Sequence, residues 1–179
     1  MMVQMKKIFL LTIICLSTLA INCKQQIKSA SNTPQDNRTQ VQPSPGRAER
    51  GTPAEAQAML RSAVAHYQAV GRKQALADFS GKKPQFFDRD LYVFCVGANS
   101  STLTANGAFP QYVGMSVDVW KDADGKPLGK AIQDAARKND QGSIEYRMSN
   151  PLSGQIEPKI SFWQKLGEDV CGVGAYNPR

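Results

Sequence analysis

Side chains that commonly catalyse reactions or bind metals are scarce in this chain. Its 179 residues include one histidine, His66, and four cysteines. These residues cannot build a Ser-His-Asp or Cys-His arrangement or a histidine-based zinc site, and no CxxC motif supports dithiol chemistry. His66 lies beside the apolar stripe of a predicted helix, which favours a solvent-facing or helix-edge position. We therefore expect no catalytic residue, no metal and no cofactor, and we keep an exported enzyme as the least favoured alternative.

Two short motifs imitate ligand-binding loops. In "DADG" (122–125), aligning Gly125 with the glycine of an EF-hand loop places Trp120 and Ala131 at the two end positions, where calcium needs oxygen ligands. The motif therefore predicts an Asp-Gly turn. "GVGAYN" (172–177) begins like a dinucleotide-binding loop but lacks the third glycine and the following helix, so it predicts a strand.

The N-terminus indicates export. Lys6 and Lys7 precede an apolar run from 8 to 21, which is short for a membrane span and typical of a secretory signal peptide covering 1–22. Cys23 follows directly in "LAINC", a pattern like that of bacterial lipoproteins, whose cysteine is lipidated after cleavage. Asn22 is unusual there, and an ordinary signal peptidase could instead cut after Ala20. We expect a periplasmic or cell-surface lipoprotein anchored to a membrane by lipid.

A polar segment separates this signal from the folded part. Residues 23–51 are rich in Gln, Ser, Asn and Pro and predict a disordered linker, either a tether after lipidated Cys23 or an ordinary disordered N-terminus. The chain has 22 basic and 15 acidic residues, or a balance near +5 without Lys6 and Lys7. The basic residues are scattered and not interleaved with aromatic residues, so we expect no nucleic-acid partner. The surplus fits solvated surface or attraction to anions.

Cysteine parity predicts one disulfide bond. Cleavage before Cys23 removes Cys15 and commits Cys23 to lipid, which leaves Cys95 and Cys171 as an even pair in an oxidising compartment. A bond between them requires the first and last long strands to be neighbours, with Cα atoms within about 7 Å. The alternative is two separate buried thiols.

The folded part reads as one α+β domain over 52–177. "TPAE" supplies an N-cap at Thr52, a proline at the first helical position and a capping box with Glu55, and apolar residues then recur at helical spacing up to Gly71. Strand-like and helical stretches follow with turn residues between them. After this first helix we predict two short helices, over 72–79 and 128–138. We predict strands over 90–98, 101–107, 143–148, 159–166 and 169–176.

The order of the motifs "DLYVF", "VG", "DADGKP", "Y…NP", "EPK" and "GVGAY" resembles that of a single Cache domain, an extracytoplasmic sensor module of bacterial chemoreceptors and histidine kinases. The resemblance runs from about Ala54 to Tyr176. It implies a long N-terminal helix packed on a five-stranded antiparallel sheet, as in Cache and PAS-like folds. It also implies that the first strand is central and lies next to the last.

The resemblance implies a small-molecule pocket above the sheet. A carboxylate ligand would pair with Lys159, oriented by the hydroxyls of Tyr92 or Tyr146. Ordinary core packing is the alternative for the aromatic residues, and a surface position is the alternative for Lys159. The implied pocket residues are Tyr92, Phe94, Asn106, Tyr146, Met148 and Lys159.

Two pocket positions depart from the family pattern. Asn106 replaces a frequent histidine, and Met148 with Ser149 replaces a Trp-Pro pair. These changes remove a group that titrates near neutral pH and a flat aromatic wall, so the ligand cannot be transferred from the family.

We therefore expect a sensory lipoprotein that binds a small organic acid or amino acid and acts through a separate membrane receptor or kinase. The alternative from another class is a ligand-free structural or surface-interaction lipoprotein that uses the same fold.

Overall fold

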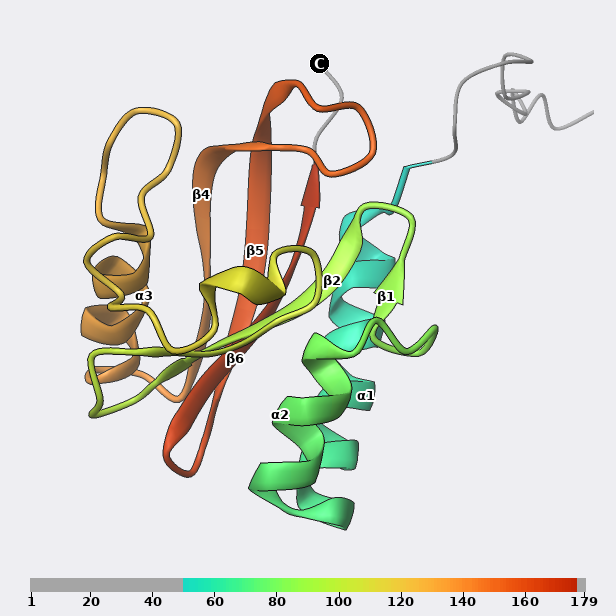
Figure 1. The fold of residues 1–179 in the computed structure, drawn as a ribbon, viewed down its shortest axis with the longest axis vertical. Coiled ribbons are helices and arrows are strands. Elements are labelled where there is room, and N and C mark those ends of the chain that lie inside the picture. Colours follow the sequence, from blue (N-terminus) through green and yellow to red (C-terminus); the bar gives the residue numbers. More distant parts are fainter. Residues whose placement is uncertain (1–49, 177–179) are drawn as a thin grey trace, which may run out of the picture. The chain divides into compact units, whose positions relative to one another are not determined.

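The computed structural model describes residues 50–176 (Figure 1). The predicted signal peptide, the predicted lipidation site Cys23, nearly all of the predicted linker and residue 177 lie outside the described residues. The fold is α+β, as predicted. Its elements are α1 (Pro53–Val70), α2 (Arg72–Ser80), β1 (Phe87–Asp88), β2 (Leu91–Gly97), β3 (Leu103–Asn106), a 3-10 turn η1 (Pro110–Tyr112), α3 (Leu128–Ala136), β4 (Gln141–Ser149), β5 (Ile156–Leu166) and β6 (Asp169–Tyr176).

The first helix begins at the predicted capping box. The Thr52 hydroxyl accepts a hydrogen bond from the Glu55 amide, and the Glu55 carboxylate accepts one from the Thr52 amide. Along α1, Ala56, Leu60 and Ala63 are buried against the sheet. His66 is only partly buried at the edge of this helix, where it pairs with Asp78 of α2 at 2.8 Å.

The strands form one antiparallel sheet in the order β1-β2-β6-β5-β4, and β3 pairs with β2. β1 and β3 pair with β2 at different positions, while β6 pairs with β2 and β5 along its two edges. The expectation that the first strand is central is therefore wrong, because β6 takes that place. The predicted contact between the first and last long strands is present. The short β1 had no signal in the sequence.

A disulfide bond joins Cys95 of β2 to Cys171 of β6, which is the predicted pairing. The two residues are direct register partners, and their Cα atoms are 4.1 Å apart. Both are fully buried in the core that packs under α1 and α2. The bond therefore joins two neighbouring strands at the centre of the sheet, on the face that α1 and α2 cover.

Each face of the sheet has its own apolar core. α1 and α2 cover one face, where Phe79, Val93 and Val173 are fully buried. α3 and the segment 107–127 cover the other face, where Phe94, Trp120 and Ile132 are buried. The alternation of side chains along each strand sorts them between these two cores.

The "DADG" motif is a turn, as predicted. The Asp122 carboxylate accepts hydrogen bonds from the backbone amides of Asp124 and Lys126, and Gly125 has a φ of 81°. Residues 50–176 contain no group of three or more histidine, cysteine or acidic side chains placed to hold a metal ion. Within that range, no helix has the length and apolar composition that crossing a bilayer requires.

Gly172 on β6 is required by close packing, and we expect Gly172→Ala to destabilise the domain by about 2 kcal/mol. An added Cβ would lie 2.5 Å from the Phe94 ring and 2.8 Å from the backbone carbonyl oxygen of Phe162, and that backbone cannot move without breaking the ladder. Urea unfolding measures the loss. Gly114→Ala, which has open space but a φ of 87°, would show the backbone cost alone.

Candidate functional site

A cavity of about 230 Å³ lies on the face of the sheet that α3 covers. Aromatic and apolar side chains make most of its wall, and Lys121 is the one charged residue among the described residues that line it. No acidic side chain is among them. The lining residues are Tyr92, Leu103, Phe109, Tyr112, Met115, Val119, Trp120, Lys121, Met148 and Ser149.

The outer wall of the cavity is the segment after β3. Asn106 is fully buried, and its Oδ1 accepts hydrogen bonds from the amides of Ala108 and Phe109 at 3.2 and 2.8 Å. This cap fixes the start of the segment. The Phe109 ring then lies edge-on to Tyr92 at 6.1 Å and stacks on Tyr112 at 5.8 Å. Asn106 therefore positions the wall and does not line the cavity itself.

Lys159 of β5 is the most unusual charged residue near the cavity. Its side chain is 2% exposed, and its Nζ has no hydrogen-bond partner among the described residues. The Nζ lies 4.0 Å from the ring centre of Tyr92 and 4.5 Å from that of Tyr176. Burial lowers the pKa of Lys159 to about 7, although the charge of Asp90 acts in the opposite direction. A cation that lacks a hydrogen-bonded partner is costly to bury.

Two glycines of β6 make room on this face of the sheet. A Cβ at Gly174 would lie 2.3 Å from the Cε of Lys159, and a Cβ at Gly172 would overlap the ring of Phe94. The alternating "GVG" therefore leaves this part of the strand bare, so that side chains from β5 and β2 can lie across it.

Three buried tyrosines surround the lysine. The hydroxyl of Tyr146 hydrogen bonds to the Ser161 hydroxyl at 2.8 Å, and the hydroxyl of Tyr176 donates to the carbonyl oxygen of Ser149 at 2.6 Å. Tyr92 is 2% exposed, and this burial raises its pKa well above the ordinary value. The charge of Tyr176 and a hydrogen bond with it raise the pKa of Tyr92 further. These hydroxyls remain neutral donors at physiological pH.

The structure brings only part of the predicted set to the cavity. Tyr92 and Met148 line it. Lys159 and Tyr146 do not line it; they are buried next to Tyr92 and Ser161 respectively, and both belong to the lining of a separate pocket. Phe94 packs against Trp120 at 5.1 Å, inside the apolar core. For Phe94 the structure thus gives the core position that was the alternative to a pocket residue.

The sequence interpretation missed most of the outer wall, namely Phe109, Tyr112, Met115 and Trp120. The available signal was an apolar run, "FPQYVGM", in a stretch whose Pro and Gly predict irregular backbone. Tyr112 and Met115 are 40% and 42% exposed. Exposed apolar side chains on an irregular segment are typical of a ligand-binding loop rather than of a core.

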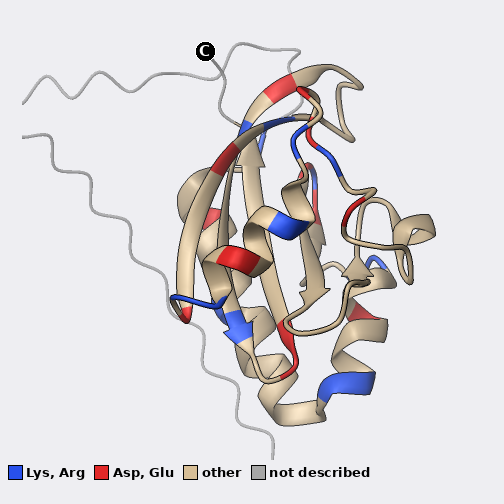
Figure 2. Cartoon of the chain, turned by 90° about the vertical axis from the view of Figure 1, so that its left-hand side faces the viewer, with Lys and Arg blue, Asp and Glu red and all other residues tan. Residues whose placement is uncertain are grey.

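Charges elsewhere on this side of the molecule are mixed. Figure 2 shows basic and acidic residues interspersed on the side that carries α3, where Lys130 pairs with Asp134 at 2.7 Å and Arg147 pairs with Asp124 at 3.0 Å. Such exposed pairs contribute little stability. The described surface on this side forms no continuous basic patch of the kind that nucleic acid requires.

Several solved structures have similar folds, three of which are described below. A methyl-accepting chemotaxis protein from Vibrio parahaemolyticus aligns at a TM-score of 0.58 and 20% identity, over 69% of this chain and 86% of that one. A Cache chemosensory domain, described in terms of carboxylic acid recognition, aligns at 0.52 and 18%, over 70% and 88%. A periplasmic sensor domain of a chemotaxis protein aligns at 0.53 and 20%, over 70% and 90%. The comparison with curated proteins found no match.

At these identities the three structures show a shared fold. Membership rests on the sequence, because the family model for the single Cache domain 2 matches residues 21–176. That range includes every helix and strand described above. The chain therefore belongs to the single Cache domain 2 family.

Proposed function

We propose that this domain reversibly binds a small carboxylate in the cavity beneath the 107–120 segment, outside the cytoplasm. The observation that carries the proposal is Lys159, a buried cation without a hydrogen-bond partner among the described residues, which shares Tyr92 with the cavity wall. An anion that reached Nζ would supply the missing partner, and the tyrosine hydroxyls would orient it. The similar Cache chemosensory domain that is described in terms of carboxylic acid recognition supports the same ligand class.

The lining favours an organic acid over an amino acid. An amino acid would bring an ammonium group, and the described lining offers no carboxylate to receive it. Asp90, the buried acid whose charge acts on Lys159, already accepts hydrogen bonds on both oxygens, from the Gly51 amide and the Asn150 side chain. The cavity volume of about 230 Å³ is below the ~300–1,000 Å³ of typical ligand pockets. We infer a monocarboxylate with a short apolar body.

Tyr92 would have to move for the ligand to reach the lysine. Its ring belongs to the cavity wall, whereas Lys159 does not line the cavity. We propose that ligand entry rotates the Tyr92 side chain and replaces its contact with Nζ by the ligand carboxylate. The ion pair formed in this buried place would offset the cost of the movement.

A thermal-melt panel tests this function. Propionate and isobutyrate are expected to raise the melting temperature, and a ligand at 100 times its Kd adds about 2.7 kcal/mol. Propionamide, which is uncharged, and alanine, which carries the extra ammonium, are expected to have little effect. Lys159→Met should abolish the response, whereas Lys165→Met, on an exposed position of the same strand, should keep it. Equal melting shifts with propionamide and propionate would refute the proposal.

Binding should also depend on pH. Free Lys159 has a pKa of about 7, and a bound carboxylate favours its charged form, so binding takes up a proton. The Kd for propionate is therefore expected to rise about fifty-fold between pH 7 and pH 9. Titration calorimetry in buffers of different ionisation heat measures both the affinity and the proton uptake. An affinity that is constant over this range would mean that Lys159 does not contact the ligand.

We further propose that the domain informs a separate membrane receptor or kinase, and that lipidation at Cys23 tethers it to the membrane. A ligand changes a partner's state only through different affinities for two conformations, which the partner must distinguish. Metabolic labelling with a fatty-acid analogue, lost in Cys23→Ala, tests the anchor.

A further inference from the structure

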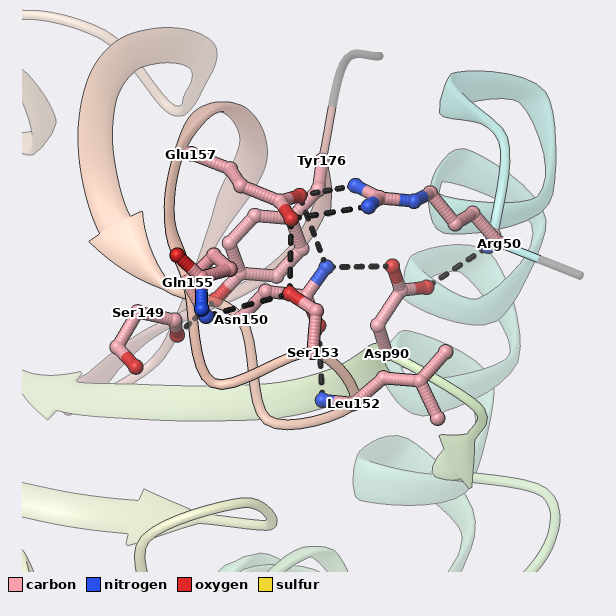
Figure 3. Close-up of polar contacts among 10 residues, drawn as sticks. Arg50, Asp90, Ser149, Asn150, Leu152, Ser153, Gln155, Glu157 and Tyr176 are labelled. Atoms are coloured by element: carbon pink, nitrogen blue, oxygen red, sulfur yellow. Dashed lines mark hydrogen bonds and ion pairs between the residues drawn. The ribbon is translucent and has the colours of Figure 1, made fainter. Parts of the chain in front are cut away.

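A polar cluster connects the start of the described domain to the hairpin between β4 and β5 (Figure 3). The Arg50 guanidinium pairs with both oxygens of Glu157, with Nη2 at 2.9 Å from Oε1. The Gly51 amide donates to Oδ1 of Asp90 at 2.7 Å. The Asn150 Nδ2 donates to Asp90 Oδ2 and to Glu157 Oε2, each at 3.1 Å. We call Arg50, Asp90, Asn150 and Glu157 the latch.

Hydrogen bonds within the hairpin hold it together as one unit. The Asn150 Oδ1 accepts from the Leu152 amide at 2.8 Å, and the Asn150 amide donates to the carbonyl oxygen of Gln155 at 2.8 Å. The Ser153 hydroxyl donates to Glu157 at 2.8 Å. Asn150 and Asp90 are both fully buried. Displacing the hairpin would break the hydrogen bond between buried Asn150 and Asp90 and the pair between Glu157 and Arg50, so the latch holds one defined position.

The same hairpin begins at the cavity. Ser149 lines the cavity, and its carbonyl oxygen accepts the hydrogen bond from Tyr176. Tyr176 in turn lies against Lys159 and interacts with Tyr92. Arg50 and Tyr176 are the first and last of the described residues. They are thus connected through Ser149 and Asn150, because Asn150 hydrogen bonds to Glu157, the partner of Arg50.

We propose that the latch holds the cavity in its closed state, in which Tyr92 and Tyr176 enclose Lys159, and that a carboxylate that pairs with Lys159 releases Arg50 and Gly51. The inference rests on the proposed function for its ligand. The physical reason is that Lys159 becomes accessible from the cavity only if Tyr92 moves, and Tyr92 interacts with Tyr176. A shift of Tyr176 would in turn break its hydrogen bond to the carbonyl oxygen of Ser149, where the hairpin begins. By reciprocity, breaking the latch should favour binding by the same factor with which binding loosens the latch.

The test uses Glu157→Gln in the full chain, with Asp134→Asn as a control that removes the surface ion pairs to Lys130 and Arg137. Acetylation of Lys159 by acetic anhydride, read by mass spectrometry, reports the closed state, and exposed Lys165 in the same chain is the reference. Amide hydrogen exchange at Gly51 reports the latch, and exchange at Val173 reports global opening. Arg50→Gln breaks the same pair from the other side and replaces Glu157→Gln if that variant does not fold.

We expect Glu157→Gln to speed Lys159 acetylation by about five-fold or more and to speed exchange at Gly51. Lys165 and Val173 should not change, and Asp134→Asn should match the wild type. Propionate should speed Gly51 exchange in the wild type and bind Glu157→Gln more tightly. Faster exchange at Gly51 with unchanged acetylation of Lys159 would overturn the proposal. If propionate does not bind the wild type, the proposed function fails, and the acetylation result still decides whether the latch closes the cavity.

Discussion

A Lys159→Met variant is expected to be more stable than the wild type at pH 7, by about 3 kcal/mol. Burial lowers the pKa of this lysine from 10.5 to about 7, and each pKa unit corresponds to ~1.4 kcal/mol. The unfolded chain therefore binds the proton more tightly than the folded chain, and the buried group costs about 4 kcal/mol at pH 7. Methionine fills a similar volume without a charge, so most of that cost disappears.

The sign of the pH dependence makes this prediction specific. Between pH 7 and pH 9 the unfolded state holds more protons at Lys159, so wild-type stability should rise by roughly 2 kcal/mol as pH increases. In Lys159→Met this rise should be absent. The window ends near pH 10, because tyrosines whose pKa values are raised by burial begin to ionise in the unfolded chain and reverse the trend. Urea unfolding at pH 7, 8 and 9 measures both curves.

A wild-type stability that does not change with pH, or a Met variant less stable than the wild type at pH 7, would contradict the burial of an unpartnered cation. The expected gain in stability coincides with loss of carboxylate binding in the same variant. Such a trade-off is typical of functional sites, where a costly group is retained for the ligand it serves.

The largest loss is expected when Cys95 and Cys171 are both replaced by alanine. Their bond closes a loop with a sequence separation of 76 residues. The chain-entropy model assigns such a loop about 4 kcal/mol of stabilisation. We expect the melting temperature of the double variant to fall by roughly 12–20 °C.

Reductant supplies the control for this second prediction. Dithiothreitol should lower the melting temperature of the wild type by a similar amount and leave the double variant unchanged. An equal effect of reductant on both proteins would show that the bond contributes nothing. Carboxylate binding should survive below the new melting temperature. Both cysteines lie on the face of the sheet that α1 and α2 cover, and the cavity lies on the opposite face.

The sequence predicted the elements well where local signals were strong. The capping box at Thr52 set the start of α1, and turn residues separated the strands within a few positions of their actual bounds. Strand order was harder. The even number of remaining cysteines and their positions identified β2 and β6 as neighbours. Which strand lies at the centre depends on the pairings along both edges of each strand, and no local pattern contains that information.

The site was predicted only in part for a similar reason. The sequence pattern located Lys159 and Tyr92, but it could not show that Tyr92 separates the lysine from the cavity, which depends on rotamers and on the bare glycines of β6. Phe94 and Tyr92 are two residues apart on β2 and therefore point to the same side of the sheet. Trp120, which comes from a distant segment, packs on Phe94, whereas Tyr92 stays in the cavity wall. The latch was not predicted, because Arg50 and Glu157 are 107 positions apart.

The glycines at 172 and 174 have a consequence for divergence among related sensors. Since β6 has no side chain at these two positions, the side chains of the neighbouring strands β2 and β5 determine which groups lie over them. Relatives can therefore exchange a lysine or an aromatic ring on those flanking strands and acquire a different chemical preference, while the strand that anchors the architecture stays the same.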